Sequence, residues 1–185
     1  MIKKLGIKSI ILWAGTLLAI VSMFLLFASG VTSSNVMRGM GLNGTYGPAY
    51  AFVFGGNMNI VTNYGTINTK LDCVSPLALV AWIILLVAVL AACVASFLAF
   101  KKNKLSGIIG LAAGVLMILA GIFFFCVLKQ CINAIFGNEL DAESISELIS
   151  ACNAKLGGGF ISAGVVSIVA GLTCATPMVL GFIKK

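Results

Sequence analysis

The sequence contains no histidine and very little charge of either sign. Only 9% of its residues are charged, whereas a soluble domain carries about 25%. Without histidine, neither a serine–histidine–aspartate arrangement nor a histidine-ligated metal site can form. There is also no Cys-x-x-Cys pair and no acidic cluster with ligand spacing, so the sequence predicts no metal and no cofactor. We therefore expect a protein that is not an enzyme.

Basic residues are few as well, although they outnumber the acids by 12 to 5. The net charge of +7 does not indicate nucleic-acid binding, because the cations stand in short clusters beside apolar runs without interleaved aromatic residues. Hydrophobic residues make up 61% of the chain. Such a chain would expose too much apolar surface to stay monomeric in water, so the lipid bilayer is its expected partner.

Four long apolar runs predict an all-α membrane protein built as a four-transmembrane-helix bundle. They cover residues 7–28, 76–100, 105–128 and 160–183. Each supplies about 20 residues or more, which at a rise of about 1.5 Å per residue crosses a hydrocarbon core of about 30 Å. After Lys8 none of them contains a charged residue. Because lipid offers the backbone no hydrogen bonds, these runs should be helices.

The lysines predict which way the helices face. Eight basic residues and no acids lie before the first run, between the second and third, and after the fourth. The loops at residues 29–75 and 129–159 hold the other four basic residues and all five acids. By the positive-inside rule, both termini are cytoplasmic and these loops lie outside a cell (plasma) membrane. The alternative is that the first run is a cleaved signal peptide, although it exceeds the apolar core of about 7–15 residues usual there.

The first loop is predicted to form a small antiparallel β-sheet. Aromatic residues alternate with smaller ones over residues 49–54, and this period of two predicts a strand. Gly55-Gly56-Asn57 offers a turn. Residues 58–64 and 66–71 then predict a second and a third strand.

The second loop is predicted to contain a short amphipathic helix over residues 141–154. Its apolar residues recur at helical spacing on one face. Ser144 and Glu147 have the spacing of a capping box at the helix start. Gly157-Gly158-Gly159 then predicts a flexible junction before the fourth run.

Small residues are the clearest packing signal. The third and fourth runs carry them in stripes: Gly107, Gly110, Gly114, Gly121, Gly164, Ser167 and Gly171. Such stripes let helix backbones approach closely. They favour packing inside one bundle, with contact to a second copy or to another membrane protein as the alternative.

The loops contain three cysteines, at positions 73, 131 and 152. Cys131 and Cys152 form the best candidate pair for a disulfide, because both flank the second loop and an outer face can be oxidising. Cys126, near the outer end of the third run, is a competitor. In a reducing habitat all of them would be thiols.

The layout of inside termini, a larger sheet-forming first loop and a smaller second loop is similar to that of the claudin and peripheral-myelin type of four-span protein. The resemblance covers topology only, since Gly41-Leu42-Asn43 stands where that family has Gly-Leu-Trp, and Cys73 stands alone where it has two cysteines. The chain more closely resembles small bacterial four-span proteins of unknown function. In those, a loop like Tyr50-Ala51-Phe52-Val53-Phe54-Gly55 precedes the second span and a lysine-rich link follows it. This resemblance implies no activity.

The apolar runs carry no intramembrane carboxylate of the kind that couples transport to protons or ions. The leading hypothesis is therefore a non-enzymatic structural or accessory protein that acts through helix–helix and outer-loop contacts. The alternative is a small-solute transporter or channel subunit whose path is lined by serine and threonine. A third hypothesis is an envelope-stress or immunity-type protein.

Overall fold

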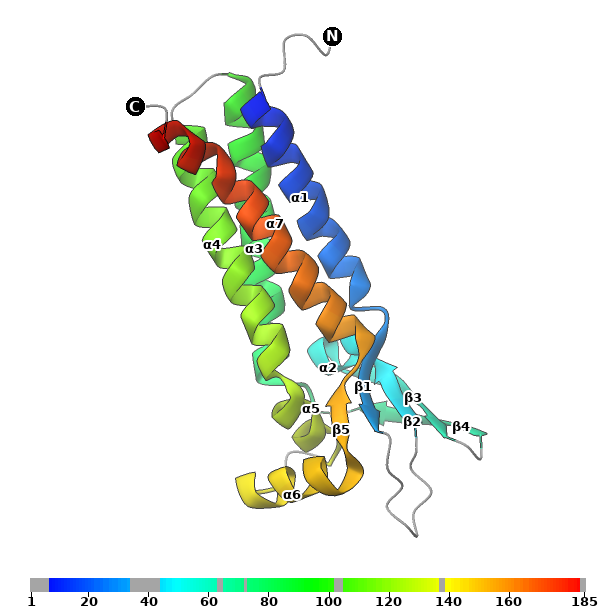
Figure 1. Cartoon of the computed structure of the whole chain (residues 1–185). Helices are drawn as coiled ribbons and strands as arrows, with labels where there is room; N and C mark the ends of the chain where they lie inside the picture. The colour runs from blue at the N-terminus through cyan, green and yellow to red at the C-terminus, as the bar shows by residue number, and fades with distance from the viewer. Residues whose placement is uncertain are drawn as a thin grey trace. The chain divides into compact units, whose positions relative to one another are not determined.

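The computed structural model describes residues 7–33, 44–62, 65–71, 73–101, 105–136 and 139–183. These residues form seven helices and five strands (Figure 1). Four of the described helices are long and apolar enough to cross a membrane. They are α1 (Ile7–Leu25), α3 (Pro76–Phe100), α4 (Leu105–Cys126) and α7 (Gly158–Ile183). The predicted four-span membrane protein is confirmed at this level.

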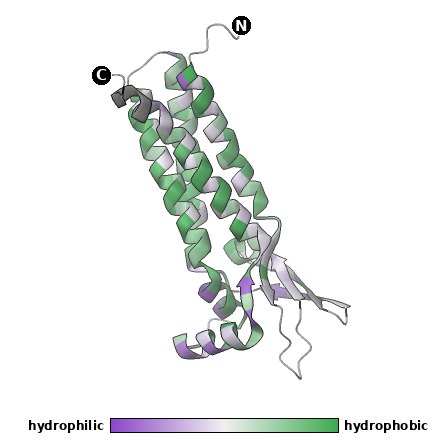
Figure 2. Ribbon diagram, viewed as in Figure 1, coloured by the Kyte–Doolittle hydropathy of each residue, from purple (hydrophilic) through white to green (hydrophobic). Residues whose placement is uncertain are grey.

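The ends of the spans differ from the predicted ones by two or three residues. α1 ends at Leu25, α4 ends at Cys126, and α7 begins at Gly158. A further helix, α5 (Leu128–Ile135), follows α4 after a single residue, which the sequence did not predict. Figure 2 shows hydrophobic residues along the four long helices and hydrophilic ones on α5 and on α6 (Ala142–Cys152).

The chain divides into two compact units. The helical unit consists of Met1–Phe24, Ala81–Ile122 and Gly164–Lys185. The sheet unit consists of Leu25–Val80 and Phe123–Ala163. The lysine clusters within residues 1–6, 102–104 and 184–185 lie outside the described residues, as do Gly41-Leu42-Asn43 and the end of the predicted strand at 63–64.

The sheet unit contains an antiparallel sheet with the strand order β4-β3-β2-β1-β5. The strands are β1 (Ser29–Ser33), β2 (Gly44–Pro48), β3 (Gly56–Thr62), β4 (Gly65–Leu71) and β5 (Ala154–Leu156). The predicted sheet after the first span is thus confirmed, and β3 and β4 match two of its three predicted strands. Val31 of β1 pairs with Tyr46 of β2 on one side and with Leu156 of β5 on the other. The sheet therefore joins the two loops that the sequence treated separately.

The first predicted strand, over residues 49–54, is wrong, because these residues form a short helix, α2 (Ala49–Phe54). Pro48 precedes it in an extended conformation and cannot donate a hydrogen bond to a neighbouring strand. The amide of Ala49 instead donates to the Ala28 carbonyl, at 2.7 Å. Gly55 ends the helix at a φ of 74°, where a side chain would be strained. Four of the six helical residues are buried, so their alternation in size did not mark one covered and one exposed face.

The core of the sheet unit is aromatic. Phe52, Phe124 and Phe160 are fully buried, and the ring of Phe160 lies 6.2 Å from Phe52 and 6.1 Å from Phe124 between centroids. Gly30 of β1 leaves room for this cluster, since an added Cβ would stand 2.5 Å from the Phe52 ring. The helix that replaces the predicted strand therefore supplies one of the three buried rings of this core.

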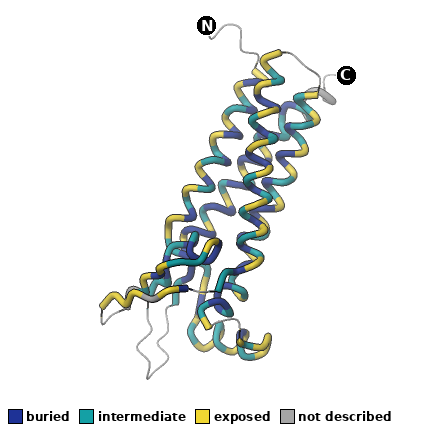
Figure 3. The backbone as a smooth tube through the Cα atoms, turned by 180° about the vertical axis from the view of Figure 1, so that it is seen from behind, coloured by how far each residue is buried: buried dark blue, intermediate teal, exposed yellow. Residues whose placement is uncertain are grey.

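The helical unit buries many of its small residues and exposes many of its large ones. Alanines of α3 such as Ala88 and Ala92 are fully buried, whereas Leu90 is 59% exposed and Phe97 is 61% exposed. Figure 3 shows buried and exposed residues alternating along each long helix. In water this exposed apolar surface would drive aggregation, and in a bilayer it faces acyl chains.

Candidate functional site

Helices α4 and α7 pack with their backbones close together in the helical unit. A Cβ added to Gly114 would stand 2.5 Å from the Gly171 carbonyl oxygen, and a Cβ on Gly171 would stand 2.5 Å from the Gly114 carbonyl oxygen. About two turns further along α4, a Cβ on Gly121 would lie 2.8 Å from the Gly164 carbonyl oxygen. Four of the seven predicted packing residues therefore face one another inside a single chain.

The remaining predicted packing residues behave differently from one another. Gly110 leaves room for Leu12 of α1, whose Cδ2 would lie 2.8 Å from an added Cβ. The Ser167 hydroxyl donates to the Met117 carbonyl at 2.7 Å and so ties α7 to α4. Gly107 makes no close approach, because the nearest atom to its added Cβ is 3.9 Å away. The stripe is therefore a packing surface along most of its length but not at its first glycine.

Sequence reasoning missed Gly15, which serves the same purpose on α1. An added Cβ would stand 2.5 Å from the Cys174 sulfur of α7. α1 has no other glycine within its bounds, so no stripe marked this position. A single glycine in a span is a weak signal until the neighbouring helix is known.

Several hydroxyl groups of the spans bond within their own helices. Thr16 donates to the Leu12 carbonyl and Ser96 donates to the Ala92 carbonyl, each at 2.8 Å. The two hydroxyls also lie 3.3 Å apart, joining α1 to α3 in a fully buried contact. Hydroxyls used in this way hold helices together, and they do not present donors to a passing solute.

A partly buried polar cluster in the sheet unit was not predicted. The side-chain oxygen of Gln130 accepts hydrogen bonds from the Leu77 amide, at 2.7 Å, and from the Ser75 hydroxyl, at 3.2 Å. The Ser75 oxygen in turn accepts from the Ala78 amide at 3.3 Å. Two first-turn amides of α3 are thereby satisfied, because a helix start leaves such groups without partners. Gln130 lies 53 residues from Leu77 in sequence, so no local pattern could have shown the contact.

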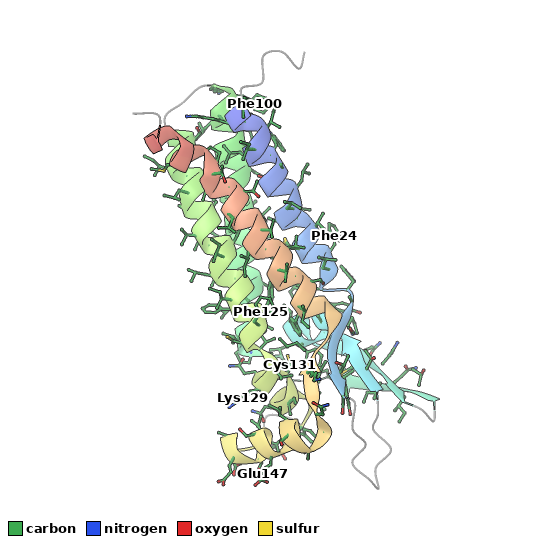
Figure 4. The ribbon with its side chains drawn as sticks, in the orientation of Figure 1. Phe24, Phe100, Phe125, Lys129, Cys131 and Glu147 are labelled. Carbon is green, nitrogen blue, oxygen red and sulfur yellow. The ribbon has the colours of Figure 1, made fainter. Side chains whose placement is uncertain are left out.

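All six cysteines lie in the described part of the chain, and each is a free thiol. The predicted Cys131–Cys152 disulfide is therefore not formed in this structure. Cys131, labelled in Figure 4, is fully buried on α5, and burial raises the pKa of its thiol although a hydrogen bond with Ser75 opposes the shift. Cys152 is partly exposed at the end of α6. The buried thiol packs as a small apolar group.

Helix α6 confirms the amphipathic helix predicted in the second loop, but its cap is different. Asp141, not Ser144, is the N-cap, and its carboxylate accepts from the Ser144 amide at 2.7 Å. These hydrogen bonds from Ser144 lower the pKa of Asp141. The apolar face of α6 packs through Ile145 against Ile132 of α5. Glu147 is exposed on the other face (Figure 4).

The junction at Gly157-Gly158-Gly159 is closely packed, which corrects the prediction of a flexible one. The Gly157 amide donates to the Gly30 carbonyl at 2.8 Å, and the Gly158 amide donates to the Ser29 hydroxyl at 3.0 Å. A Cβ on Gly159 would stand 2.6 Å from the Ala28 carbonyl oxygen. These glycines let the start of α7 lie against the start of β1.

The β3–β4 hairpin is the least covered part of the sheet. β4 is an edge strand, and residues 65–68 are exposed at four successive positions. Because successive strand residues point to opposite faces, neither face of β4 is covered there. Ile67 is 54% exposed, and Asn57 and Asn59 of the neighbouring strand β3 are also exposed. Figure 3 shows the exposed stretch along this hairpin. The hairpin thus exposes backbone groups, asparagine side chains and one large apolar side chain on the same surface.

Within the described residues, no three histidine, cysteine or acidic side chains gather in a way that would hold a metal ion. Comparison with models of known protein families and with curated proteins finds no match to this chain.

Proposed function

We propose that this multi-pass protein is a non-enzymatic structural or accessory protein of the cell (plasma) membrane, and that the β3–β4 hairpin is its contact surface. In this proposal both termini are cytoplasmic and the sheet unit faces outside. The distribution of basic residues supports the orientation, since eight of the twelve lie at the termini and in the link between α3 and α4.

The observation that carries the proposal is the exposure of β4 on both faces and along one edge. Soluble and membrane proteins usually shorten, twist or cover such an edge, because it can pair with another chain. Here the edge strand is seven residues long and carries one lysine, Lys70. An extended segment of a partner can add to it through backbone hydrogen bonds, with Ile67 supplying apolar contact.

Packing within the helical unit supports contact over transport. The hydroxyls of Thr16, Ser96 and Ser167 are fully buried and each donates to a backbone carbonyl. The α4–α7 glycines fill their interface with backbone. A solute path would need hydroxyls that face an opening.

The proposal is tested by placing a photo-crosslinking amino acid at Asn68 of β4 in the full chain in its native membrane. We expect a discrete adduct of constant mass that disappears when Ile67→Lys is added, while the amount of protein stays the same. The same crosslinker at Ser150, an exposed position of α6, is the matched control and should give no such adduct. Equal adducts at both positions, or none at Asn68, would contradict the proposal.

A second measurement addresses the transporter alternative. Purified protein in liposomes should not accelerate the release of trapped small ions or amino acids above the level of empty liposomes. Saturable release that depends on the protein would favour the alternative.

A further inference from the structure

Two buried polar groups of α1 have no hydrogen-bond partner among the described residues. They are the hydroxyl of Ser9 and the indole N–H of Trp13, one turn apart on the same face of the helix. Ser9 is only 3% exposed. A buried donor without an acceptor destabilises a protein, and the hydrocarbon core supplies no water in its place.

Trp13 lies against the end of α3. Its ring centroid is 5.6 Å from that of Phe97, in an edge-to-face arrangement, and 6.3 Å from that of Phe100. Phe100, labelled in Figure 4, is the last residue of α3. Both phenylalanine rings are themselves 46% exposed or more, so they stand between the indole and the surrounding lipid.

Two exposed lysines flank the same cluster. Lys8 directly precedes Ser9 on α1, and Lys101 directly follows Phe100. We call this group the lysine-rich end of the helical unit. It consists of Lys8, Ser9, Trp13, Phe97, Phe100 and Lys101. It combines two cations, two donors without acceptors, and two exposed aromatic rings.

The helical unit cannot neutralise these cations with its own residues. Its three segments contain eight lysines and no aspartate or glutamate, because all five acids of the chain belong to the sheet unit. A carboxylate for the lysine-rich end must therefore come from outside this unit, if the cations are to be paired. In a bilayer the abundant anionic acceptor at a helix end is the phosphate of a lipid.

We propose that the lysine-rich end binds the headgroup of an anionic phospholipid. Lys8 and Lys101 attract the phosphate, the Ser9 hydroxyl donates to one of its oxygens, and the Trp13 indole donates to an ester carbonyl. Four helical residues span about 6 Å along the axis. The polar layer of one leaflet is about 5–7 Å thick, so the two donors match the levels of phosphate and ester.

The lipid reaches the indole when the rings of Phe97 and Phe100 rotate outward. Both rings face lipid, and exposed side chains change rotamer in picoseconds to nanoseconds. The acyl chains then lie along the exposed apolar residues of α3. Tryptophan is also the side chain most suited to this level of the bilayer, since its ring is apolar and its N–H is polar.

The experiment uses the full-length protein in nanodiscs that contain equal amounts of phosphatidylglycerol and phosphatidylcholine. Native mass spectrometry after release then counts the lipids that stay bound. We expect the unmodified protein to retain phosphatidylglycerol about tenfold more than phosphatidylcholine. Trp13→Phe keeps the ring and removes the donor to the ester carbonyl, which both lipids carry, so it should lower the retention of both lipids about tenfold. Trp82→Phe, the other tryptophan, is the matched control and should leave this retention unchanged.

Ser9→Ala and Lys8→Gln test the same site with changes that keep the helix intact. Ser9→Ala should lower the retention of both lipids, because both carry a phosphate, and Lys8→Gln should lower the preference for phosphatidylglycerol. Unchanged retention in Trp13→Phe and Ser9→Ala, or equal retention of the two lipids by the unmodified protein, would overturn the proposal. Displacement of the lipid by millimolar inorganic phosphate would also overturn it, because the site would then recognise the free ion.

Discussion

The contact between α4 and α7 makes a quantitative prediction for the single substitution Gly171→Ala. The new Cβ would stand 2.5 Å from the Gly114 carbonyl oxygen and 2.8 Å from a side-chain carbon of Ile118. Ordinary contact begins at 3.4 Å, so the helices must separate locally by 3.4 − 2.5 = 0.9 Å. The obstacle is a backbone oxygen, which cannot turn aside as a side chain can.

The magnitude follows from two opposing effects. Overpacking of this kind costs about 1–3 kcal/mol, and a backbone obstacle belongs at the upper end of that range. Alanine in a helix is favoured over glycine by about 1 kcal/mol. Gly171→Ala should therefore destabilise the protein by about 2 kcal/mol in total.

Gly107→Ala provides the matched control on the same pair of helices. Its added Cβ would lie 3.9 Å from the nearest atom, on Met178, so only the helix propensity changes. This variant should be stabilised by up to about 1 kcal/mol, and the difference of about 3 kcal/mol between the variants isolates the packing. Unfolding of the purified protein in mixed micelles by sodium dodecyl sulfate, followed by circular dichroism, measures both. Equal stabilities of Gly171→Ala and Gly107→Ala would refute the close approach of α4 and α7.

Three further predictions concern the sheet unit. Replacing Gln130 with leucine removes the acceptor of the partly buried first-turn amide of Leu77 in α3, so we expect a loss of about 1–3 kcal/mol and faster hydrogen exchange of that amide. Gly30→Ala places a Cβ 2.5 Å from a buried aromatic ring and should lower the unfolding temperature, whereas Gly158→Ala has 3.7 Å of room and should not. The thiol of Cys131 is buried with a raised pKa, so it should resist maleimide in the folded protein between pH 7 and 9 and react only after unfolding. Rapid labelling of Cys131 in the native protein would count against its burial.

The parts of this fold that the sequence predicts are those that depend on local composition. The four spans follow from long runs without charge, whose length alone matches the bilayer. Strands β3 and β4 follow from β-branched and polar residues on either side of a short connection, and α6 follows from its apolar face and acidic first turn. Each of these signals lies within the element it predicts.

The parts that were missed depend on residues far apart in the chain. β1 pairs with β5 through Thr32 and Lys155, and neither strand is long or alternating enough to be recognised alone. The alternating sizes over Ala49–Phe54 suggested a strand because a short helix buried on most sides has no polar face. Gln130 resembles an ordinary loop residue until the start of α3 is placed beside it. Single sequences carry no signal for such contacts.

If the two proposals hold, the separation of charge between the two units means that each unit binds its partner by different physical means. The sheet unit has four basic and five acidic residues and is nearly neutral, and its exposed hairpin offers asparagine, threonine and Ile67. A contact made there depends on backbone hydrogen bonds and apolar burial, which salt does not screen. The helical unit has eight lysines and no acid, so its attraction for lipid phosphate is Coulombic.

This difference separates the two proposals in one experiment. The Debye length falls from about 10 Å at 0.1 M salt to about 3 Å at 1 M. Over that range the Asn68 adduct should keep its yield, while retention of phosphatidylglycerol should fall several-fold. If instead the adduct is lost in high salt, the hairpin contact is itself electrostatic. The exposed Lys70 would then be the residue that attracts an acidic partner to the edge of β4, and Lys70→Gln would reproduce the effect of salt.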